Sequence, residues 1–179
     1  MDKKKLESLF DLTDRVAIVT GGTRGIGGAI AEGLASAGAK VTVASRKEDA
    51  CAETEAHLVS LGGEALGLPT HLGDLDALHT LVDRTVDRFG GLDIVVNNAA
   101  NALPGFIGDL TPEAWEKSFG VNLRGPVFLV QEALPHLTAR PNAAILNVIS
   151  AGAFLFSQYT SMYAGAKAGL MAFTRSMAA

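Results

Sequence analysis

The chain has 179 residues and a formal net charge of −4, with 48% hydrophobic and 19% charged residues. This composition is typical of a soluble globular protein and excludes a disordered chain. The acidic balance, without any basic tract, argues against a nucleic-acid partner, and the single cysteine, Cys51, excludes an intramolecular disulfide and a cysteine-rich metal site.

The chain begins with a polar segment, residues 1–11, which we expect to form a solvated N-terminal arm. It lacks the apolar core of a signal peptide, and no apolar run further along is long enough to span a bilayer. The four histidines show no metal-ligand spacing. We therefore expect a cytoplasmic protein with no membrane partner and no bound metal.

Strands and helices alternate along the rest of the chain. Strands are expected at residues 16–20, 40–45, 64–70, 92–96 and 143–149. Helices are expected at about 26–37, from the second strand to 61, from 74 to 89, from 111 to 137 with a bend near Gly125-Pro126, and from 159 onward. This alternation predicts one α/β domain over residues 1–179, a Rossmann-like doubly wound parallel sheet with strand order 3-2-1-4-5. Four of the five strands are nearly continuous apolar runs, as a sheet covered on both faces requires.

A glycine-rich loop, Thr20-Gly-Gly-Thr-Arg-Gly-Ile-Gly27, directly follows the first strand and opens the first helix. Its glycines allow a tight turn and a close backbone approach, and the helix N-terminus offers free N–H groups to an anion. A plain strand–helix turn is the alternative interpretation. The surrounding strand, turn, helix and second strand favour the binding of a dinucleotide pyrophosphate.

The end of the second strand bears on the choice of cofactor. An acidic residue there would accept hydrogen bonds from a ribose, but this chain has Ser45-Arg46-Lys47, and Arg24 lies within the glycine loop. Arginine grips phosphate bidentately, so the pattern favours the 2′-phosphate of NADP over NAD. Alternatively, Arg46 and Lys47 are only the polar start of the next helix.

Tyr163 and Lys167 lie four residues apart in a stretch compatible with a helix, and Ser150 lies thirteen residues upstream of the tyrosine. Positions i and i+4 share a helix face, where an ammonium favours the ionised form of a phenol whose ordinary pKa is about 10. Such a tyrosine can exchange a proton with an alcohol or carbonyl near neutral pH. Alone, the spacing favours an ordinary surface tyrosine beside a solvated lysine.

Taken together, these motifs resemble the short-chain dehydrogenase/reductase (SDR) family over the chain from about Leu12 onward. The resemblance rests on the glycine spacing, on Asn97-Asn98-Ala99-Ala100 after the fourth strand, and on Asn122, Ser150, Tyr163 and Lys167 in this order. It implies that Tyr163 is the general acid/base, that Lys167 acidifies it and binds the nicotinamide ribose, and that Ser150 binds the carbonyl oxygen. Asn122 would hold a water that links Lys167 to solvent.

The resemblance also implies a set of cofactor contacts. These are Gly21, Thr23, Arg24, Gly25, Ile26, Gly27, Ser45, Arg46, His71, Leu72, Asn98, Ala99, Ala100, Tyr163 and Lys167. Two positions depart from the family pattern: Ala100 replaces a more usual glycine, and His71 replaces an aspartate that contacts adenine. His71 is interpreted either as an adenine contact or as a loop residue whose backbone does the binding. Tyr159 has no lysine four residues on, so we expect it to line the pocket or pack.

Members of this family are usually longer. The resemblance therefore implies that the chain ends within the helix of Lys167, and that the last strands of the fold and the substrate lid are absent. The fifth strand would then be an uncovered edge, and a chain truly this short is expected to show weak or absent catalysis and poor solubility. The family's dimers and tetramers imply a homodimer or homotetramer through the helices near 112–137 and 159–179. The apolar segments 102–108 and 153–156 suggest a small hydrophobic carbonyl or alcohol substrate.

The favoured function is an NADP(H)-dependent oxidoreductase that reversibly transfers hydride between nicotinamide and a carbonyl/secondary-alcohol pair. The alternative is a non-catalytic dinucleotide-binding protein, such as a redox sensor or an assembly subunit. A hydrolase is disfavoured because no Gly-x-Ser-x-Gly motif surrounds Ser150.

Overall fold

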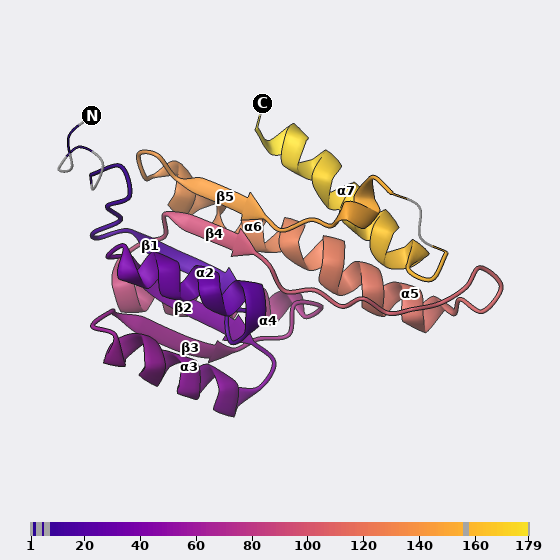
Figure 1. Cartoon of the computed structure of the whole chain (residues 1–179), viewed down its shortest axis with the longest axis horizontal. Coiled ribbons are helices and arrows are strands. Elements are labelled where there is room, and N and C mark those ends of the chain that lie inside the picture. Colours follow the sequence, from indigo (N-terminus) through magenta and orange to yellow (C-terminus); the bar gives the residue numbers. More distant parts are fainter. Residues whose placement is uncertain (1, 3–4, 6–7, 156–157, 179) are drawn as a thin grey trace.

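The computed structural model describes residues 2, 5, 8–155 and 158–178. Five parallel strands form one sheet in the order β3-β2-β1-β4-β5, which confirms the predicted topology (Figure 1). The strands are β1 (Val16–Thr20), β2 (Lys40–Ser45), β3 (Ala65–Pro69), β4 (Ile94–Asn97) and β5 (Ala144–Asn147). The helices are α2 (Gly25–Ser36), α3 (Glu48–Ser60), α4 (Leu75–Phe89), α5 (Pro112–Phe119), α6 (Gly125–Thr138) and α7 (Ser161–Met177), with a π-helix η1 (Gly120–Arg124) and a short 3-10 helix η2 (Ala151–Ala153).

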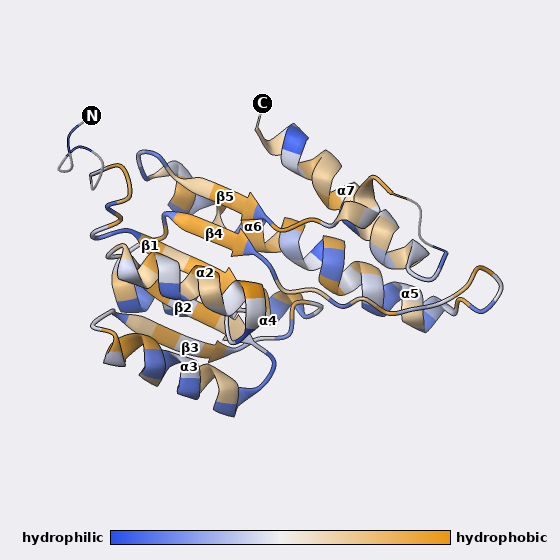
Figure 2. Ribbon diagram, viewed as in Figure 1, coloured by the Kyte–Doolittle hydropathy of each residue, from blue (hydrophilic) through white to orange (hydrophobic). Residues whose placement is uncertain are grey.

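The sheet is covered on both faces. Ile18 and Val95 pack toward α4 and α6, whereas Val19 and Val43 pack toward α2 and α3. Because successive strand residues point to opposite faces, a strand buried on both sides must be apolar throughout. β1 is buried along its whole length and is apolar from Val16 to Val19, and Figure 2 shows apolar residues along the strands.

The strand register brings the functional loops to one edge. Thr20 lies beside Ala44, Ser45 beside Pro69, and Asn97 beside Asn147, so the carboxyl ends of all five strands lie along a common edge. The glycine loop and the segments that follow β2, β3, β4 and β5 therefore meet there. Ligands of open parallel sheets bind at this edge.

A π-helical turn interrupts the predicted long helix. The helical run over residues 112–138 is confirmed, but its irregularity lies at Gly120–Arg124, upstream of the bend expected near Gly125-Pro126. The Gly125 N–H bonds to the Gly120 carbonyl, which is the wider π pattern, and Pro126, which has no N–H to donate, directly follows this turn in α6. A side chain at Gly125 would collide with the Leu72 carbonyl, so glycine lets α6 approach the loop that follows β3.

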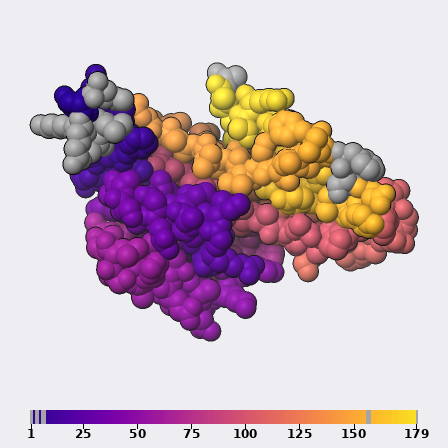
Figure 3. Space-filling model, in the orientation of Figure 1, coloured from indigo at the N-terminus to yellow at the C-terminus, as the bar shows by residue number. Residues whose placement is uncertain are grey.

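The last strand and helix lie at one side of the molecule. Figure 3 shows β5 and α7, in orange and yellow, beside the earlier segments in indigo and magenta. β5 pairs with β4 alone among the described strands, and Leu146 on it is 51% exposed. The predicted edge position of β5 is therefore confirmed for the described residues. None of the described helices is both long and apolar enough to cross a bilayer.

Candidate functional site

A cleft of about 900 Å³ lies at the carboxyl edge of the sheet. The predicted cofactor residues outside α7 all line it, namely Gly21, Thr23, Arg24, Gly25, Ile26, Gly27, Ser45, Arg46, His71, Leu72, Asn98, Ala99 and Ala100. Its lining also includes Ala44, Lys47, Ala50, Thr70, Asn101, Ala102, Leu103, Lys117 and Val121. The cleft thus follows the ends of β1, β2, β3 and β4 and reaches the junction of α5 with η1.

The glycine loop forms one wall of the cleft at the start of α2. Gly21 has a φ of +64°, which side chains rarely adopt. A side chain at Gly27 would collide with the Gly21 carbonyl and the Asn98 amide. No side chain caps α2, and its first turn contains no acidic residue. The first N–H groups of the helix are therefore available to an anion.

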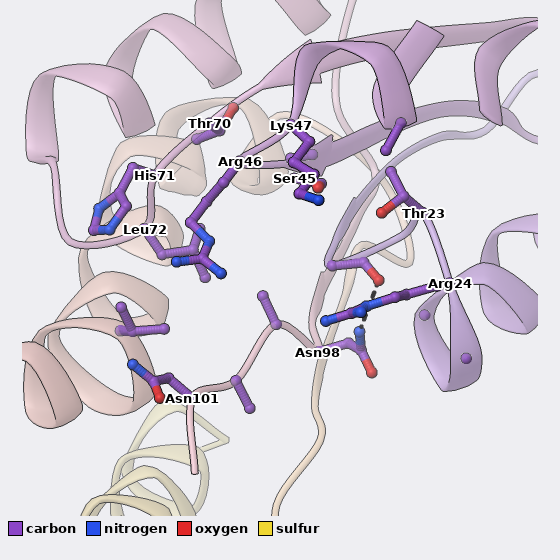
Figure 4. A pocket seen from close by; sticks show the side chains of 18 of the residues that line it. Thr23, Arg24, Ser45, Arg46, Lys47, Thr70, His71, Leu72, Asn98 and Asn101 are labelled. Atoms are coloured by element: carbon purple, nitrogen blue, oxygen red, sulfur yellow. Dashed lines mark hydrogen bonds between the residues drawn. The ribbon is translucent and has the colours of Figure 1, made fainter. Parts of the chain in front are cut away.

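Thr20 and Asn98 tie the glycine loop to the segment after β4. The Thr20 hydroxyl donates to the Val96 carbonyl at 3.1 Å and accepts from the Asn98 and Ala99 N–H groups at 3.0 and 3.2 Å. The Asn98 amide donates to the Thr20 and Gly21 carbonyls at 3.0 and 3.3 Å (Figure 4). Thr20 was not among the predicted site residues, and its partner Asn98 lies 78 residues further along the chain.

The cleft is cationic within an acidic protein. Arg24, Arg46, Lys47 and Lys117 line it, and none of its described lining residues is acidic. These four side chains make no ion pair with any residue that the structure describes. Figure 4 shows Arg24 and Arg46 reaching into the cleft from the start of α2 and the end of β2. Uncompensated cations around one hollow favour a polyanionic ligand.

His71 makes a local hydrogen bond beside the cleft. Its Nδ1 accepts from the Gly73 N–H at 3.1 Å. A backbone N–H can only donate, so in the neutral ring the hydrogen lies on Nε2 and that nitrogen can only donate. An aspartate would accept at this position, so His71 cannot simply reproduce an aspartate contact in this arrangement. Its adenine contact stays a prediction.

Asn122 lies within η1 and is fully buried. Its Oδ1 accepts from the Asn101 N–H at 2.8 Å, and its Nδ2 donates to the Asn101 carbonyl at 2.7 Å and to Ser118 Oγ at 3.3 Å. Both amide hydrogens are therefore used, so the side chain could bind water only through the second lone pair of Oδ1. Its water-holding role stays a prediction, and the clamp on Asn101 is an additional finding.

Lys167 is almost fully buried, with 1% of its surface exposed. Its Nζ donates to the Val148 carbonyl at 2.6 Å and lies 5.9 Å from the centre of the Tyr163 ring. Burial lowers the pKa of its ammonium to about 8, because the charged form loses solvation. The residue therefore remains mostly protonated at neutral pH, next to the tyrosine.

Ser150 lies at the start of η2, beside the first turn of α7. Its Oγ accepts from the Gly152 N–H at 3.1 Å, which leaves the hydroxyl hydrogen free to donate elsewhere. A Cβ added at Gly152 would lie 3.5 Å from Ser150 Oγ and 3.7 Å from the Cβ of Ala164, the neighbour of Tyr163. Ser150 and Tyr163 are thus brought to the same corner of the molecule.

Comparison with known proteins decides the family. The family model described as short chain dehydrogenase matches residues 15–179. The chain belongs to this family. It is 42% identical over 171 residues to the short-chain dehydrogenase/reductase FrzI of Cladobotryum sp, covering 93% of this chain and 64% of FrzI. It is 36% identical to human dehydrogenase/reductase SDR family member 4, covering 93% of this chain and 60% of that protein.

Solved structures give the same result. A short-chain dehydrogenase from Burkholderia cenocepacia J2315 in complex with NADP superposes with a TM-score of 0.88 at 35% identity, covering 93% of this chain and 68% of that one. A putative short-chain alcohol dehydrogenase from Sinorhizobium meliloti 1021 gives a TM-score of 0.90 at 34% identity, covering 94% and 67%. The chain spans about three fifths of the length of the curated relatives it matches.

The predicted site residues fall into two adjoining groups. The predicted cofactor residues outside α7 line the cleft, whereas Asn122, Ser150, Tyr163 and Lys167 are not part of its described lining. Asn101 joins the groups, because it lines the cleft and its backbone is held by Asn122. The roles assigned to these residues stay predictions.

Aromatic side chains border the corner that holds Ser150 and Tyr163. Phe106 and Tyr159 meet edge to face with ring centres 4.8 Å apart, and each is about half exposed. The Gly105 N–H donates to the Tyr159 carbonyl at 2.9 Å, which holds the two loops together. Tyr159 packs against an aromatic neighbour near Tyr163, which agrees with the expectation that it lines a pocket or packs.

Proposed function

We propose that the chain acts as an NADP(H)-dependent oxidoreductase that interconverts a carbonyl compound and a secondary alcohol by reversible hydride transfer. One observation carries the proposal: a cationic cleft with a glycine-loop wall adjoins a corner that contains a serine hydroxyl, a tyrosine and a buried lysine. Family membership supports the reaction class.

The cleft residues fit a dinucleotide. Gly21 and Gly27 let the glycine loop pack closely against Asn98, and the uncapped start of α2 offers N–H groups to a pyrophosphate. Arg24 and Arg46 would grip a 2′-phosphate on the adenosine ribose, which favours NADP over NAD. The Burkholderia relative in complex with NADP supports this choice. When bound, the nicotinamide cofactor supplies or accepts the hydride.

The chain's own residues would handle the proton and the developing charge. The free hydrogen of Ser150 would bond to the substrate oxygen and orient the carbonyl. Tyr163 would donate its phenolic proton to that oxygen during reduction and recover it during oxidation. The Lys167 ammonium would stabilise the phenolate left behind, because it lies beside the ring and is held in place by Val148.

The substrate is proposed to be a small hydrophobic carbonyl or alcohol. Leu103 lines the cleft, and Phe106 and Tyr159 expose apolar surface near it. We also propose a homodimer or homotetramer, because Trp115 on α5, Leu134 on α6 and Phe173 on α7 are each about half exposed. Sedimentation of the purified chain as a monomer would contradict the assembly.

Turnover and cofactor binding test the function together. We expect the wild-type chain to oxidise NADPH, at a low rate, in the presence of diketones. We expect Tyr163→Phe to lower that kcat further by at least about a hundredfold, since general acid–base catalysis contributes on that order. NADPH affinity should be unchanged in this variant. Tyr159→Phe is the matched control and should retain turnover. If the chain binds NADPH without turnover, and Tyr163→Phe does not change that binding, the result would instead support the alternative of a non-catalytic dinucleotide-binding protein.

A further inference from the structure

One face of α7 carries a series of residues from its first turn to near its end. They are Tyr163, Lys167, Leu170 and Thr174. At about 100° per residue, Tyr163 and Thr174 lie within about 20° of the same direction around the helix axis. Any contact that fixes the direction of Thr174 therefore also fixes the direction of Tyr163.

Two asparagine side chains join Thr174 to the sheet. Asn97 on β4 and Asn147 on β5 are register partners on neighbouring strands. Asn97 Nδ2 donates to Asn147 Oδ1 at 2.8 Å, and Asn147 Nδ2 donates to Thr174 Oγ1 at 2.9 Å. This asparagine ladder, defined as Asn97, Asn147 and Thr174, runs from β4 across β5 to α7.

Hydrogen-bond chemistry fixes the direction of the ladder. The only hydrogen of the Thr174 hydroxyl goes to the Leu170 carbonyl at 2.7 Å, so Thr174 Oγ1 must accept from Asn147. Asn147 therefore turns its oxygen toward Asn97, and Asn97 must present its nitrogen. The second hydrogen of that nitrogen points to the Pro126 carbonyl at 3.4 Å.

The ladder is unfavourable at one atom. Asn97 is 1% exposed, and its Oδ1 has no hydrogen-bond partner among the described residues. A buried acceptor without a partner destabilises the fold.

A second attachment lies two helical turns away on the same face. Lys167 Nζ donates to the Val148 carbonyl at 2.6 Å, and the Val148 N–H donates to the Asn97 carbonyl at 2.9 Å. α7 is therefore attached to the end of β5 through Lys167 and through Thr174. Two attachments on one face restrict both the rotation of a helix and its sliding along its axis.

We infer that the asparagine ladder is a positioning device that sets the rotation and height of α7 and thereby aims Tyr163 at the reacting carbonyl. Thr174 is a positioning residue, because it acts through the helix and forms hydrogen bonds with Asn147 and Leu170, not with Ser150, Tyr163 or Lys167. The catalytic part of this inference rests on the proposed function. The geometric part, that Thr174 fixes the direction of Tyr163, does not.

Thr174→Val tests the ladder with almost no change of shape. It removes the acceptor of Asn147, and Thr174→Ser restores that acceptor. We expect kcat to fall by about tenfold or more in the valine variant, since small misplacements of reacting groups cost up to about a hundredfold. The KM for NADPH should stay within about twofold, because the cleft is untouched. The serine variant should recover kcat. Wild-type kcat in a folded Thr174→Val protein would overturn the inference.

An NMR measurement separates this inference from the proposed function. The chain has two tyrosines, Tyr159 and Tyr163, so ¹³Cζ-tyrosine labelling gives two signals, which Tyr163→Phe assigns. Thr174→Val should shift the Tyr163 signal and leave the Tyr159 signal in place, and Thr174→Ser should shift neither. An unmoved Tyr163 signal in Thr174→Val overturns the inference even if the wild type shows no turnover. A moved signal without wild-type turnover supports the inference and contradicts the proposed function. If the valine variant does not fold, Thr174→Ala replaces it in both measurements.

Discussion

Replacing Lys167 by methionine separates function from stability at the centre of the site. The two side chains have similar length, but methionine has neither a charge nor a donor. We expect Lys167→Met to lose turnover, because the ammonium beside Tyr163 is gone. We also expect its free energy of unfolding to stay close to that of the wild type, which is unusual for a change at a residue with 1% exposure.

Two opposing contributions to the free energy of unfolding underlie that expectation: the burial of the Lys167 charge and its hydrogen bond to Val148. Burial lowers the pKa of Lys167 from 10.5 to about 8, and at 1.36 kcal/mol per pKa unit the charged side chain costs about 3 kcal/mol of stability at neutral pH. The unfolded chain binds this proton more tightly, so the cost is full below about pH 8 and fades as the pH rises toward 10.5. Methionine removes the cost but leaves the Val148 carbonyl without its donor, a loss of about 1–3 kcal/mol.

Urea denaturation of both proteins at two pH values is the assay. At pH 7 the variant should be as stable as the wild type or more stable, by up to about 2 kcal/mol. Between pH 7 and about pH 9.5 the wild type should gain about 2 kcal/mol relative to the variant, because only the wild type releases this proton. A variant destabilised by more than about 2 kcal/mol at pH 7, or a pH-independent difference, would refute the reasoning.

Two further predictions concern the cleft. Arg46→Asp should reduce NADPH affinity by about tenfold or more and improve NADH affinity, because it removes a charged hydrogen bond to the 2′-phosphate and adds an acceptor for the ribose hydroxyls. Fluorescence titration with both cofactors measures the two affinities. An unchanged preference for NADPH would show that Arg46 does not bind the 2′-phosphate. Gly27→Ala should abolish NADPH binding, since its Cβ collides with the Gly21 carbonyl and the Asn98 amide. In Gly33→Ala, on the same helix, the added Cβ meets no atom within 4 Å, so this control variant should bind NADPH normally. Equal NADPH affinities of the two variants would contradict a role for the close packing of Gly27 against Gly21 and Asn98.

Much of the fold follows from local patterns. The apolar runs at β1, β2 and β4 and the glycine loop before α2 predict a doubly covered parallel sheet, and the strand order agrees. The site residues gather because the carboxyl ends of parallel strands share one edge. Residues far apart in sequence, such as Arg24, Arg46 and Asn98, thereby line a single cleft.

Other features depend on contacts that no local pattern encodes. The π-helical turn at Gly120–Arg124 arises where Asn122 pairs with the backbone of Asn101, a partner twenty-one residues away. The ladder from Asn97 to Thr174 requires β4, β5 and α7 to be assembled first. Tertiary polar contacts of this kind leave no periodic signal in the sequence, and the same holds for the Thr20 clamp on Asn98.

A crystal structure of the chain with NADPH and a substrate analogue bound tests the central claim most directly. The account predicts the adenosine 2′-phosphate between Arg24 and Arg46, and the reactive carbon of the nicotinamide facing a substrate oxygen that both Ser150 Oγ and the Tyr163 hydroxyl contact within about 3.2 Å. A cofactor whose nicotinamide ring lies away from Ser150, Tyr163 and Lys167 would contradict it.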